Sequence, residues 1–298
     1  MEARLYFRDL VLDDIPAVKE LVKDIWDGHD YMPRVIDRWV SQNEATVFGA
    51  FEDEAMTQLV GIARVRWLFD DMAWLEGGRV APDLQKTGIG KALAQHSIEI
   101  AKDGGARIAR YDTGMENEGS IKLAKQFGFQ QIDFMHQVTA NPANLSIENM
   151  TDGEHGDIRA ISAEDALLAY ESIENPPNDM LCAGFVWMPR TIEHFTSRRL
   201  TFIRNDSAIL LVLDRDDDAM AETPPDNERW FVVYGQAAAA AGLVRYQSNV
   251  LMNESGIDRI DVFCPEGLLQ SMLDIGFGYE EGIPGGTLLF EKILLENS

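Results

Sequence analysis

The sequence predicts an α/β fold of mixed α+β type, in which a mainly antiparallel sheet is flanked by helices and the pattern occurs twice. Two observations lead to this prediction. Apolar runs with strand character alternate with amphipathic helical segments along the 298 residues. The order of these segments in the first half returns in the second half. With 46% hydrophobic residues, the chain can bury a sizeable core.

The first half, residues 1–140, begins with a strand in ARLYFRDL, a helix that runs to about Trp26 and a second helix after Pro33. Three strand-like runs follow, ATVFGAF, LVGIARVRWLF and MAWLEGGRVAP, and the short polar turns between them are typical of an antiparallel meander. The half ends with a helix from Gly88 to about Lys102, a strand in RIARYDT, a helix in NEGSIKLAKQFGF and a strand in QIDFMHQVT.

Residues 141–157 are rich in Asn, Asp, Gly and Pro, which predicts a linker. The second half, residues 158–298, starts with a helix capped by Ser162 and a second helix in WMPRTIEHFTSRR. Strands in TFIRN, AILLVLD and RWFVVYG come next, then a helix in QAAAAAGLVRYQSNVL, a strand in IDRIDVFC, a helix in PEGLLQSMLDIGF and a strand in TLLFEKILL. Because Gly128-Phe129 and Gly276-Phe277 occupy matching places, we infer a tandem duplication, with two unrelated α/β domains as the alternative.

The formal net charge is -24, with a pI near 4.5. A nucleic-acid partner is not expected, because a surface that binds phosphates needs clustered Lys and Arg. A negative field attracts cationic amines and repels anionic cofactors. Any phosphate ligand must therefore be held by groups in its immediate surroundings.

Membrane insertion and export are not expected either. No apolar run approaches the roughly 20 residues that span a bilayer, and the first residues, MEARLYFRDL, contain no apolar signal region. A cytoplasmic location follows, in which Cys182 and Cys264 are expected to be buried thiols. The five histidines form no HxH or HxxxH pair, so no metal site is expected. No pattern indicates an oligomeric state.

The segment after Ala81 combines glycines and lysines at the start of a predicted helix. Gly88 and Gly90 allow the backbone to approach an anion closely, and the N–H groups of a helix start point toward it. Lys86 and Lys91 add positive charge in an acidic chain. The segment has neither the GxGxxG of a dinucleotide-binding βαβ unit nor the GKS or GKT of a P-loop. It therefore predicts a pyrophosphate-binding loop of another kind.

The residues around this loop resemble a known family. Gln85, Gly88 and Gly90 form QxxGxG after the strand end VAP, and YDTGMEN and LAKQFGF follow in order. This arrangement resembles the Gcn5-related N-acetyltransferase (GNAT) superfamily over residues 1 to about 140. The resemblance implies a GNAT sheet with two splayed strands, between which acetyl-CoA binds as cosubstrate. It implies cofactor contacts from the strand end, the loop and the start of the next motif: Val80, Ala81, Gln85, Lys86, Thr87, Gly88, Ile89, Gly90, Lys91 and Asn117.

A narrower resemblance concerns IWDGHDYMPRVIDRW and LEGGRVAP, which are similar to the histidine N-acetyltransferase-like branch. That branch has an acetyltransferase half followed by a degenerate half. The resemblance of this sequence to it implies a free amino acid or similar small amine as acceptor. In the second half, Tyr234-Gly235-Gln236 and five alanines stand in place of the loop. Because this segment has no Gly-x-Gly and no basic residue, the second half is expected not to bind coenzyme A. It either completes the amine pocket or stabilises the first half.

Acetyl transfer needs a neutral amine and therefore a general base. Glu76, four residues before Val80 on the strand beside the acyl site, is the candidate, and a solvent-facing structural carboxylate is the alternative. The family's tyrosine that protonates the leaving thiolate is replaced here by Ala124. Tyr111, Ser120 and Tyr31 are the candidates to take its place. Departure as the thiolate anion is the other alternative.

The loop Gly28-His29-Asp30-Tyr31 is the candidate amine site. Asp30 would attract an ammonium group and Tyr31 or Trp39 would cover an apolar face of the substrate, while a turn capped by Asp30 is the structural alternative. We therefore expect an acetyl-CoA-dependent N-acetyltransferase that acts on a small primary amine such as an amino acid. A protein or peptide N-acetyltransferase, and a catalytically weak acyl-CoA binding or sensing module, are the alternatives.

Overall fold

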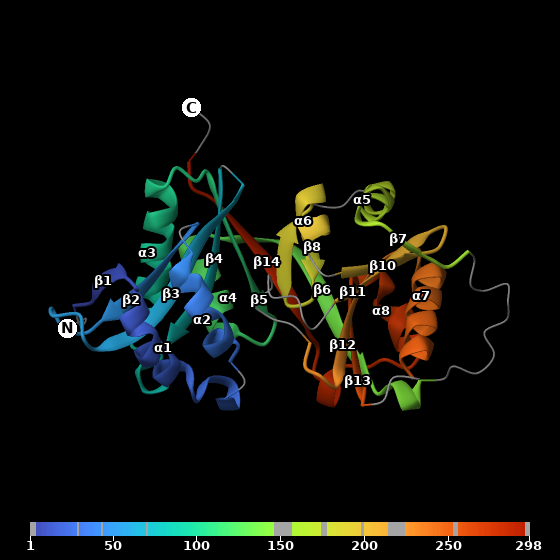
Figure 1. Cartoon of the computed structure of the whole chain (residues 1–298), viewed down its shortest axis with the longest axis horizontal. Helices are drawn as coiled ribbons and strands as arrows, with labels where there is room; N and C mark the ends of the chain where they lie inside the picture. The colour runs from blue at the N-terminus through green and yellow to red at the C-terminus, as the bar shows by residue number, and fades with distance from the viewer. Residues whose placement is uncertain are drawn as a thin grey trace. The chain divides into compact units, whose positions relative to one another are not determined.

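The computed structural model describes residues 4–28, 30–42, 44–69, 71–145, 157–173, 178–197, 200–213, 224–252 and 256–295. His29 and most of the predicted linker, residues 146–156, lie outside this part of the chain. The chain forms two compact units (Figure 1). The first unit consists of Met1–Tyr111, Gly119–Gln130 and Phe290–Ser298, and the second of Asp112–Glu118 and Gln131–Leu289.

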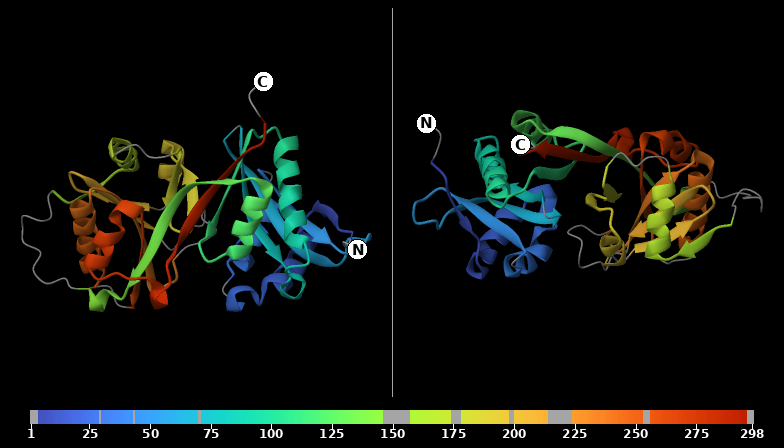
Figure 2. Two further views of the ribbon diagram at one scale, coloured as in Figure 1. Left: turned by 180° about the vertical axis from the view of Figure 1, so that it is seen from behind. Right: turned by 90° about the horizontal axis from the view of Figure 1, so that it is seen from above.

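The first unit is a mixed sheet with helices on both faces. Its strands lie in the order β1-β2-β3-β4-β5-β14, with antiparallel pairing from β1 to β4 and parallel pairing between β4 and β5. α3 lies on one face of this sheet, and α1 and α2 lie on the other (Figure 2). The elements are β1 Tyr6–Asp9, α1 Ile15–Val22, α2 Met32–Ser41, β2 Ala45–Phe51, β3 Leu59–Phe69, β4 Met72–Val80, α3 Ile89–Asp103, β5 Ile108–Gly114 and α4 Glu118–Phe127.

Side chains of β3 point alternately to the two faces of the sheet, and one of these faces is packed into the core. Ala63 and Val65 join the core cluster that Ile89 and Leu93 of α3 complete. The residue between them, Arg64, points to the opposite face, because successive strand side chains alternate. One face of β3 is therefore apolar and the other carries guanidinium groups.

The register between β3 and β4 contains a bulge next to the predicted site. Arg64 pairs with Glu76 and Ile62 pairs with Arg79, so β4 uses one residue more than β3 over this interval. Gly77 takes up the distortion with φ +68°, and a Cβ there would lie 2.6 Å from the Trp39 ring of α2. A larger residue at this position would therefore push α2 away from the sheet.

The second unit repeats this arrangement. Its strands lie in the order β14-β6-β13-β12-β11-β10-β7, and β12 and β13 form a parallel pair connected by α7, as β4 and β5 are connected by α3. Its elements are β6 Gln130–Ala140, β7 Arg159–Ile161, α5 Ala163–Ser172, β8 Met180–Ala183, β9 Val186–Pro189, α6 Ile192–Ser197, β10 Leu200–Arg204, β11 Ala208–Leu213, β12 Glu228–Gly235, α7 Ala237–Leu251, β13 Arg259–Cys264, α8 Glu266–Asp274 and β14 Gly285–Ile293. The shared order of elements is what a tandem duplication predicts.

One predicted helix of the second half is confirmed only in part. WMPRTIEHFTSRR, residues 187–199, begins as strand β9, which pairs with β8 in a hairpin, and Ile192–Ser197 form the helix α6. Trp187 and Met188 are buried, so the run has no polar face from which a strand period can be read. Ser162 does cap α5, because its side chain accepts a hydrogen bond from the Asp165 N–H, as predicted. The domain limits at 140 and 158 stay a prediction.

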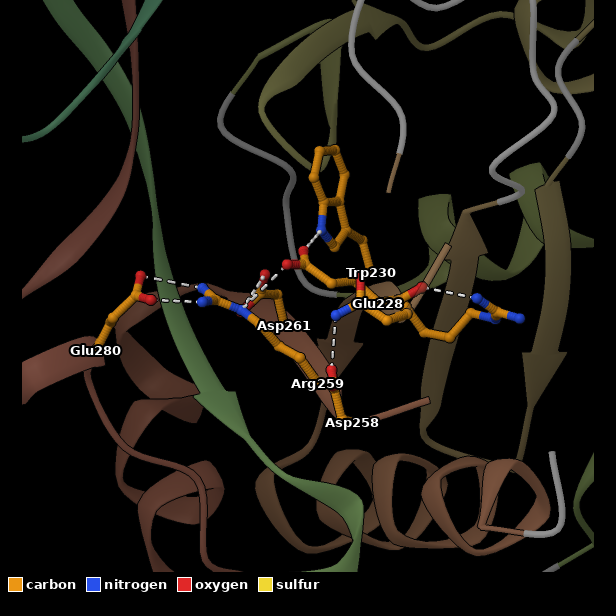
Figure 3. A network of polar contacts seen from close by, with 8 residues as sticks. Glu228, Trp230, Asp258, Arg259, Asp261 and Glu280 are labelled. Carbon is orange, nitrogen blue, oxygen red and sulfur yellow. Dashed lines mark hydrogen bonds and ion pairs between the residues drawn. The ribbon is translucent and has the colours of Figure 1, made fainter. Parts of the chain in front are cut away.

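A network of charges joins the first residues of β12 and β13 in the second unit (Figure 3). The Arg259 guanidinium donates to both carboxylate oxygens of Glu280, at 2.5 and 3.1 Å, and its Nε lies 3.1 Å from Asp261. Glu228 is 3.9 Å from the same Nε and accepts from Trp230 Nε1 at 3.3 Å. Asp261 is 1% exposed, and this burial raises its pKa to about 6 although Arg259 opposes the shift.

The raised pKa of Asp261 predicts a pH-dependent contribution to stability. Below the unfolded pKa of 3.8 the contribution is fully present, and it is lost as pH rises through about 6, because the folded state prefers the protonated acid. The full change amounts to about 3 kcal/mol. In urea unfolding between pH 4.5 and 7.5, Asp261→Asn should flatten this part of the profile. An unchanged slope would show that Asp261 does not titrate in this range.

Candidate functional site

The loop between β4 and α3 has a defined backbone. The Ala81 N–H donates to the Val60 carbonyl at 3.0 Å, a short 3-10 turn spans Pro82–Leu84, and the Thr87 hydroxyl donates to the Leu84 carbonyl at 2.6 Å. Gly88 then precedes the first residue of α3 with φ +105°, a conformation that glycine adopts without strain. These contacts hold the chain in the turn that starts the helix.

The start of α3 provides the donors that an anion needs. The first intrahelical bond runs from the Ala92 N–H to the Gly88 carbonyl at 3.0 Å, so the N–H groups of Ile89, Gly90 and Lys91 precede the helical ladder. A Cβ on Gly88 would meet open space, which leaves the backbone accessible. The side chain of Lys91 is exposed beside these donors. This geometry fits a phosphate group, because N–H donors, helix dipole and a local cation converge.

The same helix start packs between β4 and α4. A Cβ on Gly90 would lie 3.7 Å from Val80 and 3.8 Å from Leu123, so there is room for ordinary contact but little more. Gln85, Lys86 and Thr87 are exposed in the loop, and Ile89 is buried beneath it. The loop residues predicted to bind the cofactor therefore lie together around one end of α3.

Three further predicted residues lie on β5 and α4 or between them. The Tyr111 hydroxyl donates to the Ser120 carbonyl at 3.1 Å, and its ring stacks on Phe290 with centroids 5.4 Å apart. The backbone N–H of Asn117 donates to the Gly114 carbonyl at 3.1 Å. Ala124, at the place of the family's tyrosine, is 1% exposed.

Glu76 faces the side of the sheet that α2 covers. One of its oxygens, Oε1, lies 2.6 Å from Arg64 Nη1 and 2.9 Å from Arg66 Nε, and its side chain is 11% exposed. Arg64 also lies over the Trp39 ring, 4.6 Å from the centroid. Burial lowers the pKa of the Arg64 guanidinium, and the charge of Glu76 opposes this. The candidate base is thus part of a charged cluster and not a solvent-facing carboxylate.

Asp30 is held by two groups. Its carboxylate accepts a hydrogen bond from the Met32 N–H at 2.9 Å and from Arg79 Nε at 2.6 Å. The Arg79 guanidinium lies between two rings, 4.3 Å from the Trp26 centroid and 5.0 Å from the Tyr31 centroid. Asp30 therefore caps the start of α2 and anchors Arg79, which directly precedes Val80.

Sequence reasoning missed the four residues that surround the candidate base and the amine loop: Trp26, Arg64, Arg66 and Arg79. One signal was available for the arginines of β3. Arg64 and Arg66 alternate with apolar residues, which indicates one polar face on an otherwise buried strand. No local pattern marks Trp26, which is 52% exposed and has a left-handed backbone with φ 50°.

The matching place in the second unit has a different geometry. A single residue, Gln236, separates β12 from α7, whereas residues 81–88 separate β4 from α3. The Gln236 N–H donates to the Ser207 carbonyl at 2.9 Å, and a Cβ on Gly235 would lie 2.3 Å from the same carbonyl. The start of α7 is therefore closed by the backbone of the adjacent segment at Ser207.

Two features of the described residues bear on other functions. No group of three or more His, Cys, Asp or Glu in that part of the chain is arranged to hold a metal ion. Among the helices described above, none combines the length and apolar character needed to span a bilayer.

Comparisons with known proteins agree with this geometry. Residues 15–129 match the model of the acetyltransferase (GNAT) family. Over 135 residues, 42% of the chain, the sequence is 44% identical to an uncharacterized N-acetyltransferase of Methanocaldococcus jannaschii and covers 60% of it. Among solved structures, a GCN5-related N-acetyltransferase from Sphaerobacter thermophilus has a TM-score of 0.64 at 14% identity, covering 99% of this chain and 97% of its own. A tandem GNAT protein from the clavulanic acid biosynthesis pathway has a TM-score of 0.61 at 12% identity, covering 99% and 100%.

Residues 15–129, most of which lie in the first unit, are therefore similar to the GNAT family. The likeness over the full chain to a tandem GNAT structure confirms the predicted fold class, a GNAT sheet flanked by helices with a second GNAT-like domain. The chain spans 60% of the length of the curated relative that it matches. The narrower resemblance to the histidine N-acetyltransferase-like branch stays a prediction.

Proposed function

We propose that this protein is an N-acetyltransferase that moves the acetyl group of acetyl-CoA to the primary amine of a small molecule such as an amino acid. The observation that carries the proposal is the start of α3, where three backbone N–H groups, an open glycine and Lys91 surround one place. The match of residues 15–129 to the GNAT family supports it.

In this proposal, the pyrophosphate of acetyl-CoA is held by the loop Gln85–Lys91. Val80 and Ala81, at the end of β4, lie beside the acyl arm, and Asn117 contributes from the turn before α4. Acetyl-CoA supplies a thioester carbonyl that an amine can attack. The protein must then align the amine with that carbonyl and take up its proton.

Glu76 is the proposed base, because it lies on β4 four residues before Val80, with the glycine bulge between them. Its Oε1 is engaged by Arg64 and Arg66. Proton uptake would use the second oxygen, directly or through water. At pH 7, only about one in 10³ to 10⁴ molecules of a lysine-like amine is neutral. Removal of the proton from the amine therefore requires a general base.

Protonation of the leaving thiolate is assigned to Tyr111, Ser120 or Tyr31. The Tyr111 hydroxyl donates its proton to the Ser120 carbonyl, so it would have to turn away from that bond to serve. Departure as the anion is the alternative, because a thiol pKa near 8.5 makes the thiolate a tolerable leaving group. The buried Ala124 favours a second candidate function, a weakly catalytic acyl-CoA binding module.

The acceptor is proposed to enter beside Asp30, Tyr31 and Trp39. Asp30 is engaged by Arg79, so an incoming ammonium group would share its carboxylate with that guanidinium. Trp39 is 2% exposed and would act as the floor of the site under Arg64. Trp26, whose ring is exposed, would offer a face to a planar or cationic group.

The test is a thiol-release assay with acetyl-CoA across free amino acids, polyamines and peptides with free N-termini. Turnover of a free amino acid or other small amine above hydrolysis supports the proposal. Turnover of peptides alone would replace it by a protein or peptide N-acetyltransferase. Acetyl-CoA binding without turnover of any amine would favour the binding module.

A further inference from the structure

Two arginines contact the carboxylate of Glu76 in the first unit, and the charge of a third arginine acts on one of them. Arg64 and Arg66 come from neighbouring positions on one face of β3, at 2.6 and 2.9 Å from Glu76 Oε1. Arg38 lies in the last turn of α2, and its charge lowers the pKa of Arg64. We call these four residues the arginine cluster. It combines three guanidinium groups with one carboxylate in a chain whose net charge is -24.

The positive charge of this cluster is incompletely balanced. Arg64 is 7% exposed, and within the described ranges its Nε has no hydrogen-bond acceptor. Burial lowers the pKa of Arg64, and the charges of Arg66 and Arg38 add to this effect while Glu76 opposes it. A buried guanidinium is costly unless it is paired, so an excess of this kind indicates that an anion completes the cluster.

The cluster is open on the side of Arg66. The Arg66 side chain is 26% exposed, and neither its Nη groups nor the guanidinium of Arg38 contacts an acceptor in the part of the chain that the structure describes. Arg66 lies two positions after Arg64, which is about 7 Å along β3. The planar fork of a guanidinium matches the two oxygens of a carboxylate.

We propose that the acceptor amine carries a carboxylate, and that Arg66 binds this carboxylate with Arg38 adding charge. The inference rests on the proposed acetyltransferase function, because the carboxylate belongs to the same acceptor molecule whose amine would be acetylated. The amine lies toward the end of β4 and its base Glu76, and the carboxylate lies further along β3. Arg66 is then a specificity-determining residue, because it selects acids over neutral amines.

The experiment compares matched acceptor pairs, each an amino acid and its carboxamide. The series runs from glycine and the proteinogenic L-amino acids to 4-aminobutyrate and 6-aminohexanoate, so that the distance between amine and carboxylate varies. The measured quantity is the ratio of kcat/KM for acid over amide, in the wild type, Arg66→Gln and Arg38→Gln. Arg34→Gln is the matched control, because Arg34 is an exposed arginine on the same helix as Arg38.

For at least one pair, the wild type should prefer the acid about tenfold or more, the effect of a charge-assisted hydrogen bond. Arg66→Gln should reduce this ratio about tenfold, mainly through KM, and Arg38→Gln by less, while Arg34→Gln keeps it. A wild type without preference, or a ratio that Arg66→Gln leaves unchanged, overturns the proposal even where amines are acetylated. If no amine of either kind is acetylated, the proposed function itself fails.

Discussion

Replacing Gly88 by glutamate should lower the affinity for acetyl-CoA by at least about 100-fold. The new carboxylate would project into the open space beside the first N–H groups of α3, where the phosphate is proposed to bind. Two unit charges about 5 Å apart repel by about 3 kcal/mol at an effective dielectric constant of 20, which corresponds to this loss. Isothermal titration calorimetry with acetyl-CoA measures the effect.

Gly105→Glu is the matched control for this experiment. Gly105 follows the other end of α3, has φ +84°, and also faces open space, so the substitution imposes comparable backbone strain far from the loop. A left-handed residue other than glycine costs about 1–2 kcal/mol of stability in either variant. Gly105→Glu should therefore lose stability and keep its affinity. Equal losses of affinity in both variants would remove the loop as the phosphate site.

The second large effect is expected from Glu76→Gln. If Glu76 takes up the proton of the amine, kcat at neutral pH should fall by about 100-fold. The pH–rate profile should move upward, because turnover then depends on amine that is already neutral in solution. The profile of kcat/KM for the best amine between pH 6 and 10 measures this. An unchanged profile would assign Glu76 to structure alone.

A structural effect of the same substitution must be separated from the catalytic one. Glu76→Gln leaves Arg64, whose side chain is 8% exposed, without its carboxylate, and breaking a buried pair costs about 3–5 kcal/mol. Glu291→Gln offers the control, because Glu291 pairs with Arg110 at 2.7 Å and the Arg110 side chain is 7% exposed. The control should lose stability without a shift in the pH profile.

Elements with a regular period could be predicted from the sequence. β3 spans the same residues, Leu59–Phe69, as the predicted run, which is rich in strand-forming apolar residues and has Arg64 and Arg66 at alternate positions. The hairpin of β8 and β9 could not be predicted in this way. Met180–Ala183 are buried at every position, so the run shows no alternation and its length alone does not separate strand from helix.

In the candidate site too, the residues that are neighbours in the sequence could be predicted, whereas contacts between distant residues could not. The loop that ends at Gly90 could be predicted because its glycines and lysines are neighbours in the chain. The contact of Asp30 with Arg79 joins residues 49 positions apart, and that of Arg64 with Glu76 joins residues 12 apart. Such partners are selected by sheet register and helix packing, which a single sequence does not display. The sequence therefore indicated Asp30 as a polar residue of the loop, but it did not indicate that Arg79 is its ion-pair partner.

β14 has a consequence for how the protein is made. Residues Phe290–Ser298 belong to the first unit, where Glu291 pairs with Arg110 and Phe290 stacks on Tyr111. On the ribosome, the first unit therefore stays incomplete until β14, which follows β5 by more than 150 residues, has been synthesised. Until then β5 presents an unpaired edge, the kind of surface that recruits other strands. The β5 edge is therefore covered only after the chain of the second unit has been made.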